Sequence, residues 1–169
     1  SGKVVFEAKG LGKSFGNLDV FKGLDFIMAR QEKVAFVGKN GAGKTTLTRI
    51  LLGLESFEGN LMKGHNVDIG YYAQNQAEEL NPKITVLETL ESEVTLESKV
   101  NLRSMLGSFL FSGEDVDKKV SVLSGGEKAR LALCKLLLHP YNVLILDEPT
   151  NHLDLKSKSV LKDALASFD

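Results

Sequence analysis

The chain has little cysteine, no long apolar run and almost no net charge, and each shortage excludes a class of protein. The single cysteine among 169 residues, Cys134, cannot form an internal disulfide, so a reducing cytoplasmic setting is the simplest one. Because it lies among apolar residues, we expect a small core side chain rather than a redox centre. No apolar stretch is long enough to span a bilayer and no basic-then-apolar leader opens the sequence, which predicts no direct membrane insertion. The formal charge of −1 gives no reason to expect non-specific attraction to nucleic acids or membranes.

The length is that of one ordinary domain, and this domain contains a phosphate-binding motif. Residues 38–45 read Gly-Lys-Asn-Gly-Ala-Gly-Lys-Thr, which fits the pattern G-x-x-x-x-G-K-[ST]. The three glycines let the backbone turn so that its N–H groups converge on phosphate oxygens. Lys44 supplies a positive charge for the terminal phosphates, and Thr45 supplies a hydroxyl for Mg²⁺, an ion that takes few protein ligands. The motif therefore predicts nucleotide binding.

The residues on either side of this motif place it between a strand and a helix. Residues 34–37, Val-Ala-Phe-Val, form a short apolar run that is typical of a buried parallel strand. After the motif, apolar residues at i, i+3, i+4 and i+7 predict one face of a helix: Leu47, Ile50, Leu51 and Leu54. Gly53 is placed to cap the end of that helix. Strand, loop and helix occur in the order that aims a positive helix N-terminus at an anion.

The rest of the chain is expected to alternate strands and helices, which favours an α/β fold. The expected elements are strands at 4–9 and 20–28 around a turn at 12–17, a strand pair within 59–70, helices at 85–96, 102–111, 128–139 and 155–168, and a buried strand at 143–146. The last helix is expected to carry Leu161, Leu165 and Phe168 on one face.

Two carboxylates follow the apolar run at 143–146. Asp147 and Glu148 would stand at the carboxyl end of a parallel strand, where open α/β sheets bind their ligands. In phosphate-loop NTPases an aspartate at this place holds Mg²⁺, and the next carboxylate can orient and activate the attacking water. We therefore expect Asp147 to be a metal ligand and Glu148 to be catalytic.

Residues 123–127, Leu-Ser-Gly-Gly-Glu, mark a second helix start. Ser124 and Glu127 fit the S-x-x-E pattern of a capping box. Capping does not explain Gly125 and Gly126, because a glycine inside a helix costs about 0.8–1 kcal/mol relative to alanine. Both glycines make sense if phosphate approaches the backbone closely here. We therefore expect two phosphate-binding helix starts in one chain.

Leu-Ser-Gly-Gly-Glu followed by Asp-Glu-Pro-Thr resembles the signature segment and the Walker B motif of ABC-type ATPase domains, and the resemblance covers essentially the whole chain. It implies a phosphate-loop NTPase core with an antiparallel β subdomain and an inserted helical subdomain, which binds ATP and Mg²⁺ and hydrolyses ATP. It also implies that two such domains dock head to tail, so that the signature of one closes over the ATP on the phosphate loop of the other. Within one incomplete domain, 1–169, the implied parts are 1–74 for the β part and phosphate-loop core, 75–122 for the helical subdomain, and 123–169 for the signature helix, Walker B, D-loop and following helix.

Several residues take their roles from this resemblance. Phe15 matches the aromatic position that stacks on adenine, and Gln74 matches the Q-loop glutamine that contacts Mg²⁺ and the attacking water. Gln74 and Glu148 are thus the expected catalytic residues, and Thr45, Gln74 and Asp147 are the expected metal ligands. The expected nucleotide-binding residues are Phe15, Gly38, Asn40, Gly41, Ala42, Gly43, Lys44, Thr45, Thr46, Ser124, Gly125 and Gly126.

Within that family the chain is most similar to the ABC-F group. The stretches that carry this similarity are Leu-Ser-Gly-Gly-Glu-Lys-Ala-Arg-Leu-Ala-Leu and Asp-Glu-Pro-Thr-Asn-His-Leu-Asp, while residues 106–111 resemble the second of the two domains of such proteins. ABC-F proteins carry two ABC domains in one chain, have no membrane part and act on the ribosome in translation or antibiotic protection. The resemblance implies a cytoplasmic parent protein with the ribosome as its partner, by analogy and not from a site in this chain.

The last expectations concern whether the chain is a fragment of a longer protein and which other functions would fit its sequence. The family pattern continues beyond residue 169 with a strand that ends in a histidine near the γ-phosphate, and the chain starts Ser-Gly rather than Met. We therefore interpret it as an excised fragment that hydrolyses little or no ATP by itself. One alternative is the ATPase subunit of an ABC transporter, which would usually carry glutamine in place of Glu127. Another is a nucleotide-gated binding module, in which ATP-driven pairing matters more than turnover.

Overall fold

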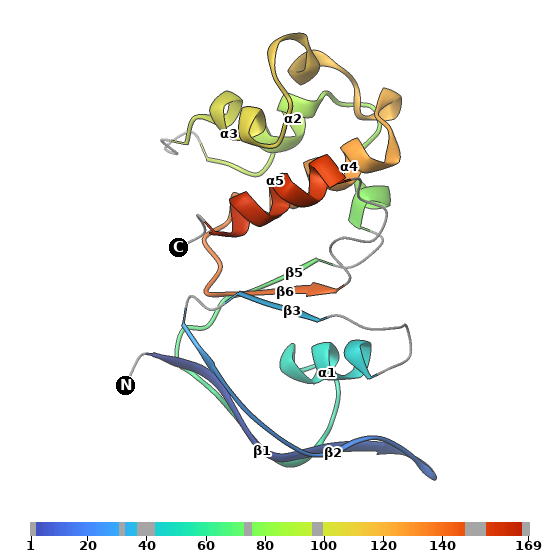
Figure 1. Ribbon diagram of the computed structural model, residues 1–169, viewed down its shortest axis with the longest axis vertical. Coiled ribbons are helices and arrows are strands. Elements are labelled where there is room, and N and C mark those ends of the chain that lie inside the picture. The colour runs from blue at the N-terminus through green and yellow to red at the C-terminus, as the bar shows by residue number, and fades with distance from the viewer. Residues whose placement is uncertain are drawn as a thin grey trace. The chain divides into compact units, whose positions relative to one another are not determined.

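The computed structural model of the protein describes residues 3–30, 33–36, 43–72, 76–95, 100–147 and 155–166 (Figure 1). The chain divides into two compact units, which are described separately. Unit 1 comprises Ser1–Tyr71 with Tyr141–Glu148, and unit 2 comprises Tyr72–Pro140 with Pro149–Asp169. The three parts expected from the sequence, with boundaries at 74/75 and 122/123, remain a prediction.

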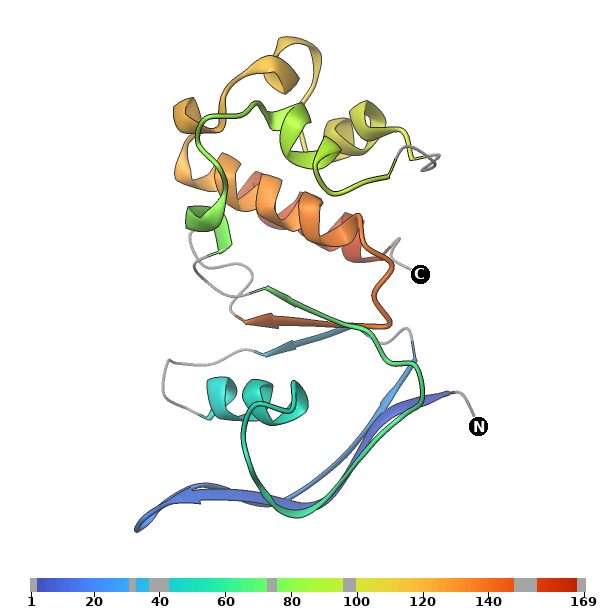
Figure 2. The same ribbon diagram turned by 180° about the vertical axis from the view of Figure 1, so that it is seen from behind.

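Unit 1 contains an antiparallel sheet with the strand order β2-β1-β4. Its strands are β1 (Val4–Phe15), β2 (Leu18–Ala29) and β4 (Glu58–Lys63). The prediction that the first strand ends at residue 9 is wrong. Leu11, Lys13 and Phe15 still pair with β2, so the long hairpin in Figure 2 turns only at residues 16–17.

The strand pair predicted within residues 59–70 is also wrong, because the two strands of this stretch lie in different sheets. β4 pairs with β1, whereas β5 (Ile69–Tyr72) belongs to the second sheet. Gly59 shows the physical reason, since a Cβ on this residue would overlap the carbonyl group of Gly10 in β1. The glycine therefore serves the close approach of β4 to β1 and not a turn between β4 and β5.

The second sheet has the order β3-β6-β5, with β3 at Lys33–Phe36 and β6 at Val143–Asp147. β3 and β6 run parallel, in a register that extends from the pair Lys33 and Leu144 to the pair Phe36 and Asp147. This confirms the prediction of two parallel strands from the two short apolar runs. The four residues before Asp147 in β6 are at most 2% exposed, as expected for a central strand.

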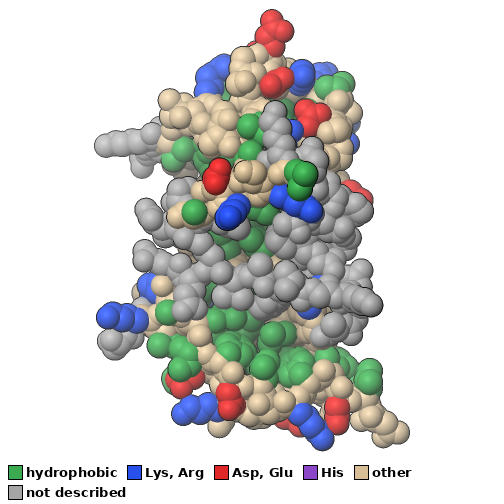
Figure 3. Space-filling model, in the orientation of Figure 1, with side chains coloured by type: hydrophobic (Ala, Val, Ile, Leu, Met, Phe, Trp, Pro, Cys, Tyr) green, Lys and Arg blue, Asp and Glu red, His purple; other side chains and the backbone are tan. Residues whose placement is uncertain are grey.

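Helix α1 (Lys44–Leu51) packs between the antiparallel sheet and β6 (Figure 2). Ile50 contacts the cluster of Ala8 and Leu11 in β1, and Leu51 belongs to a second cluster that joins residues of β1 and β6. Figure 3 shows hydrophobic side chains gathered around α1 on the visible face of unit 1. The apolar face predicted for this helix thus holds it on the sheets.

The end of α1 follows the predicted glycine. The Gly53 N–H donates to the Ile50 carbonyl at 3.0 Å, and the Leu54 N–H donates to the Arg49 carbonyl at 2.8 Å. This pair of bonds is a Schellman motif, which stops the helix. Leu54 was predicted on the buried face but is 59% exposed, because it lies beyond that stop.

Unit 2 is helical, and the longest helix in its described part is α4 (Gly125–Leu137), which is drawn in orange in Figure 2. The other elements are η1 (Gln76–Glu79), α2 (Val86–Glu91), α3 (Leu102–Ser108), η2 (Gly113–Asp117), η3 (Val120–Val122) and α5 (Leu155–Ala166). The predicted helices at 85–96 and 102–111 are both longer than α2 and α3. α3 stops early because the chain reverses direction at Leu110, whose φ is +69°. α4 starts at Gly125, as the predicted cap at Ser124 requires, and so three residues before the start at 128 that the coarse helix range gave.

Two predictions concern the interior of unit 2. Cys134 is fully buried, and this burial raises the pKa of its thiol to about 12, as fits an inert core side chain. Leu161 of α5 is 4% exposed, whereas Leu165 and Phe168 lie outside the described side chains. Across the described ranges, no helix has the length and apolar character that a membrane crossing requires.

Candidate functional site

The N-terminus of α1 is shaped by one glycine. Gly43 has a φ of +87°, and a Cβ built on it would lie 3.1 Å from Cγ1 of Val20 in β2. The left-handed backbone and the tight contact both disfavour any residue other than glycine here. A glycine supplies no capping side chain, and the first turn holds no acidic residue. The positive end of α1 is therefore free of first-turn carboxylates, as an anion site at a helix N-terminus requires.

The side chains of this first turn differ in exposure. Lys44 is only 9% exposed, which is unusual for a lysine and places its ammonium close to the protein surface rather than out in solvent. Thr45 is exposed and Thr46 is half-buried. Thr48, one turn later, is buried, and its Oγ1 has no hydrogen-bond partner within the described part of the chain. The first turn of α1 thus presents a largely buried ammonium, that of Lys44, and an exposed hydroxyl, that of Thr45.

Phe15 lies at the tip of the β1–β2 hairpin and is 49% exposed. The Lys13 ammonium lies 4.9 Å from the centroid of its ring, a cation–π arrangement that orients the ring. Lys13 is fixed in turn by Glu55 at 3.1 Å and by the Ser56 hydroxyl at 2.9 Å. The hydrogen bond from Lys13 holds the pKa of the Glu55 carboxyl below its usual value. Sequence reasoning found Phe15 and missed Lys13, although alternate residues of one strand share a face.

Unit 1 brings the hairpin and the helix start together. A Cβ on Gly43 would meet atoms of Val20 and Phe21, which follow the hairpin turn. The exposed ring of Phe15 therefore belongs to the same end of unit 1 as the first turn of α1. This end has an aromatic face and a helix N-terminus, the two features by which a nucleotide base and its phosphates are held.

The backbone of Asp147 ends β6 directly beside the end of β3. The pairing of Phe36 with Asp147 puts both carboxyl ends at one sheet edge. The side chain of Asp147 is not among those described, and Glu148 and Gln74 lie outside the described residues, as do Gly38, Asn40, Gly41 and Ala42. Within the described ranges no three His, Cys, Asp or Glu residues gather closely enough to hold a metal ion. A magnesium site built from Thr45, Asp147 and Gln74 would use oxygen donors, the type that this ion prefers.

Unit 2 holds the second predicted helix start, and its capping box is confirmed. The Ser124 hydroxyl accepts the N–H of Glu127 at 3.2 Å, and a Glu127 carboxylate oxygen accepts the N–H of Ser124 at 3.0 Å. The bond from the Ser124 backbone is the main reason why the pKa of Glu127 is lowered.

Gly125 and Gly126 are not required by the chain itself. Neither has a positive φ, and a Cβ on either would meet no atom within 4 Å. They border a cavity of about 600 Å³, whose wall also contains Lys128, Leu80 and Val120. Neither the backbone conformation nor the packing of the described residues therefore explains why this turn contains two glycines.

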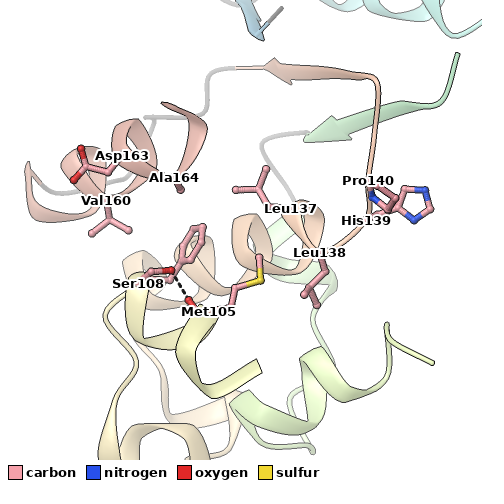
Figure 4. Close-up of a pocket in the computed structure, with 10 residues that line it drawn as sticks. Met105, Ser108, Leu137, Leu138, His139, Pro140, Val160, Asp163 and Ala164 are labelled. Atoms are coloured by element: carbon pink, nitrogen blue, oxygen red, sulfur yellow. Dashed lines mark hydrogen bonds between the residues drawn. The ribbon is translucent and has the colours of Figure 1, made fainter. Parts of the chain in front are cut away.

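A second cavity in unit 2, of about 540 Å³, lies between α3, the end of α4 and α5 (Figure 4). Met105, Leu137 and Val160 give it an apolar wall, and the Ser108 hydroxyl in that wall donates to the Met105 carbonyl at 2.6 Å. Among the described residues, none of those predicted to bind nucleotide or metal or to be catalytic lines this cavity.

Comparison with known proteins agrees with these features. Residues 21–151 match the family model described as ABC transporter. YdiF of Bacillus subtilis (strain 168), named as an ATP-binding protein, is 48% identical over 99% of this chain and 26% of its own length. ABC transporter F family member 5 of Arabidopsis thaliana is 42% identical over 99% of this chain and 25% of its own length. The chain thus spans about a quarter of these two relatives.

One solved structure shows the fold. A protein from Pyrococcus furiosus, described as an ABC transporter (ATP-binding protein), superposes with a TM-score of 0.76 at 23% identity, over 96% of this chain and 84% of that one. The predicted α/β fold of an ABC-type ATPase domain is confirmed by this superposition. The resemblance to ABC domains is confirmed by the family match.

Proposed function

The chain belongs to the ABC transporter family of ATP-binding domains, and we propose that it binds ATP with Mg²⁺ and hydrolyses it together with a second ABC domain docked head to tail. The observation that carries this proposal is the presence of two helix starts suited to phosphate, one in each unit. α1 starts at an uncapped glycine with Lys44 in its first turn. α4 starts at two glycines with free space beside them.

On this proposal, unit 1 holds the nucleotide. Phe15 stacks on the adenine, and the residues Gly38, Asn40, Gly41, Ala42, Gly43, Lys44, Thr45 and Thr46 surround the phosphates. The ammonium of Lys44 neutralises charge on the terminal phosphates, while the backbone N–H groups at the start of α1 donate to their oxygens. Mg²⁺, when bound, supplies further positive charge to the phosphate oxygens. Thr45, Gln74 and Asp147 hold that ion.

The chemical step needs a positioned water. Glu148 follows the strand end at Asp147 and is proposed to accept the proton of the attacking water, while Gln74 orients it. Ser124, Gly125 and Gly126 donate to the phosphates held by the second domain. Because each site takes groups from two domains, a single domain leaves water and phosphate poorly positioned.

We further propose that the longer protein is of the ABC-F type and acts on the ribosome in the cytoplasm. One relative at 42% identity carries the name ABC transporter F family member 5, which supports this assignment. The test is co-sedimentation of the full-length protein with ribosomes and with membranes, in ATP and in ADP. We expect ATP-dependent recovery with ribosomes, and recovery only with membranes would favour a transporter subunit.

A second test addresses turnover. Steady-state phosphate release from the full-length protein should continue over many cycles at saturating ATP. A single burst of one ATP per protein, with no further release, would instead favour a nucleotide-gated binding module.

A further inference from the structure

Arg130 lies in the second turn of α4 and joins this helix to the end of α3. Its Nη1 donates to the Phe109 carbonyl at 2.9 Å, and its guanidinium carbon lies 5.1 Å from the centroid of the Phe111 ring. Phe109 and Phe111 are at most 2% exposed, and Arg130 is half-buried, so the contact is partly shielded from water. One side chain thus connects the helix that starts at Ser124 with the residues that end α3.

The receiving side of this contact is strained. Leu110, between the two phenylalanines, has a φ of +69°, although leucine disfavours this left-handed conformation. The Phe111 N–H donates to the Leu106 carbonyl at 2.9 Å, which closes a helix-ending turn that glycine usually forms. This turn places the Phe109 carbonyl and the Phe111 ring where Arg130 meets both.

The hydrogen bonding of the Arg130 guanidinium is also incomplete. Nε of Arg130 is buried and has no hydrogen-bond partner within the described part of the chain. A buried guanidinium donor without a partner is costly, and a leucine with positive φ adds a second cost at the same contact. Two local irregularities that meet at one contact are typical of a functional position rather than of optimised stability.

The chemistry of the contact requires arginine. A flat guanidinium can donate to a carbonyl and lie over an aromatic ring at the same time, whereas a lysine ammonium cannot reproduce this combination. The acidic groups near Arg130 are Glu127 on its own helix and Asp115 of η2. Both are already bonded, Glu127 to the Ser124 N–H and Asp115 to Lys118. Arg130 is therefore directed to the end of α3 rather than to a simple ion pair.

We propose that Arg130 is a positioning residue that fixes the orientation of the first turn of α4, so that Ser124, Gly125 and Gly126 face the nucleotide of the second domain. This inference rests on the proposed function. It predicts that losing Arg130 impairs hydrolysis without impairing ATP binding, because the ATP is held by the phosphate loop and not by α4.

The kinetic test uses Arg130→Met and Arg130→Lys in the full-length protein. We expect turnover at saturating ATP to fall roughly ten- to a hundredfold in both variants, as for a displaced catalytic group. The dissociation constant for ATP should stay within about twofold of the original. Normal turnover in Arg130→Lys would overturn the proposal, because the charge alone would then suffice.

A control variant separates positioning from general destabilisation. Leu90→Ala removes a fully buried side chain from α2 in the same unit and leaves the predicted site residues unchanged. Its denaturation midpoint should fall at least as far as that of Arg130→Met, while its turnover below the transition stays near the original. An equal loss of turnover in Leu90→Ala would mean that Arg130 acts only through stability.

A third measurement does not depend on the proposed function. Amide hydrogen exchange without nucleotide should become faster at Glu127 and Lys128, whose N–H groups donate to Ser124, in Arg130→Met and stay unchanged there in Leu90→Ala. Unchanged exchange in Arg130→Met would overturn the positioning role. If instead the unmodified full-length protein releases no phosphate, the proposed function fails, while the exchange data still decide whether Arg130 orients the helix.

Discussion

The starts of α1 and α4 both contain glycine, but for opposite reasons. Gly43 is needed because of its own conformation and surroundings, since its φ is +87° and a Cβ would make a tight contact of 3.1 Å with Val20. Gly125 and Gly126 have ordinary helical backbones with free space beside them. The start of α1 also has no side-chain cap, whereas Ser124 and Glu127 cap α4 fully.

This difference separates the two proposed phosphate sites. At α1 the backbone of Gly43 shapes the proposed site, so replacing this glycine should disturb folding and binding together. At α4 the fold tolerates alanine at Gly125 and Gly126, so a replacement there should leave the fold intact and lower activity only in the paired, ATP-bound state. The following predictions test that distinction.

The largest effect is expected where binding is kept and the chemistry is removed. Glu148→Gln in the full-length protein should retain ATP binding but lower turnover roughly 10²- to 10⁴-fold, because the amide keeps the shape and loses the base. Phosphate release measures the turnover, and a binding assay measures the ATP affinity. Glu58→Gln, which changes an exposed glutamate in the same way, is the control. If the variant hydrolyses ATP as fast as the unmodified protein, Glu148 is not the catalytic base.

Lys44→Ala should break the α1 site alone. We expect ATP affinity, measured by calorimetry, to fall roughly a hundredfold, because charge-assisted hydrogen bonds are worth about 1.5–3 kcal/mol each. Lys63→Ala, which removes an exposed lysine from β4 in the same unit, should leave the affinity unchanged. If both variants bind ATP equally well, the assignment of the phosphate loop is wrong.

Gly43→Ala should affect folding and binding together. The left-handed backbone costs an alanine about 1–2 kcal/mol, and the contact with Val20 adds to this, so the urea midpoint should fall. Gly53→Ala is a matched control at the other end of α1, with a φ of +78° and no atom within 4 Å of the added Cβ. It should lower the midpoint less and spare ATP affinity, and equal losses of affinity would contradict a specific role for Gly43.

Gly126→Ala should act in the opposite direction on folding. Replacing this helical glycine should stabilise the protein by about 0.5–1 kcal/mol, while turnover falls because the Cβ meets the second domain's nucleotide. Gly107→Ala in α3 also adds a Cβ into open space and should stabilise without loss of turnover. The proposal that Gly126 serves the second domain's nucleotide is wrong if Gly126→Ala lowers the stability or if both variants hydrolyse ATP normally.

The smallest effect concerns the cap of α4. Since the folded-state pKa of Glu127 is below 4.5, its carboxylate contributes stability above that pH, and this contribution is lost as the pH falls through the lowered pKa. Glu127→Gln cannot titrate, so its urea midpoint should fall less than the original between neutral pH and about pH 4. An identical pH dependence would mean that the capping box does not stabilise the fold through its charge.

Local patterns were predictable because their partners are close in sequence. The Ser124–Glu127 box joins residues three apart, and the Gly53 stop lies directly after α1, so composition and spacing were sufficient. That β3 and β6 are strands of a parallel sheet was also predictable, because such strands read as short apolar runs, whereas their pairing with each other was not predicted. The catalytic assignments at Gln74 and Glu148 remain predictions.

The sequence by itself determined the family, the capped start of α4 and the two strands of the parallel sheet, because these depend on short motifs and local hydrogen bonds. Only the tertiary structure decided that β4 pairs with β1, that Lys13 orients Phe15, and that Arg130 meets the end of α3. The pairing of β4 with β1 and the contact of Arg130 join segments distant in the sequence, and Lys13 is fixed over Phe15 by Glu55 and Ser56, which lie far along the chain. For the same reason only the tertiary structure distinguishes Gly43 from Gly126, since the space around a missing Cβ is set by neighbours that the local sequence does not contain.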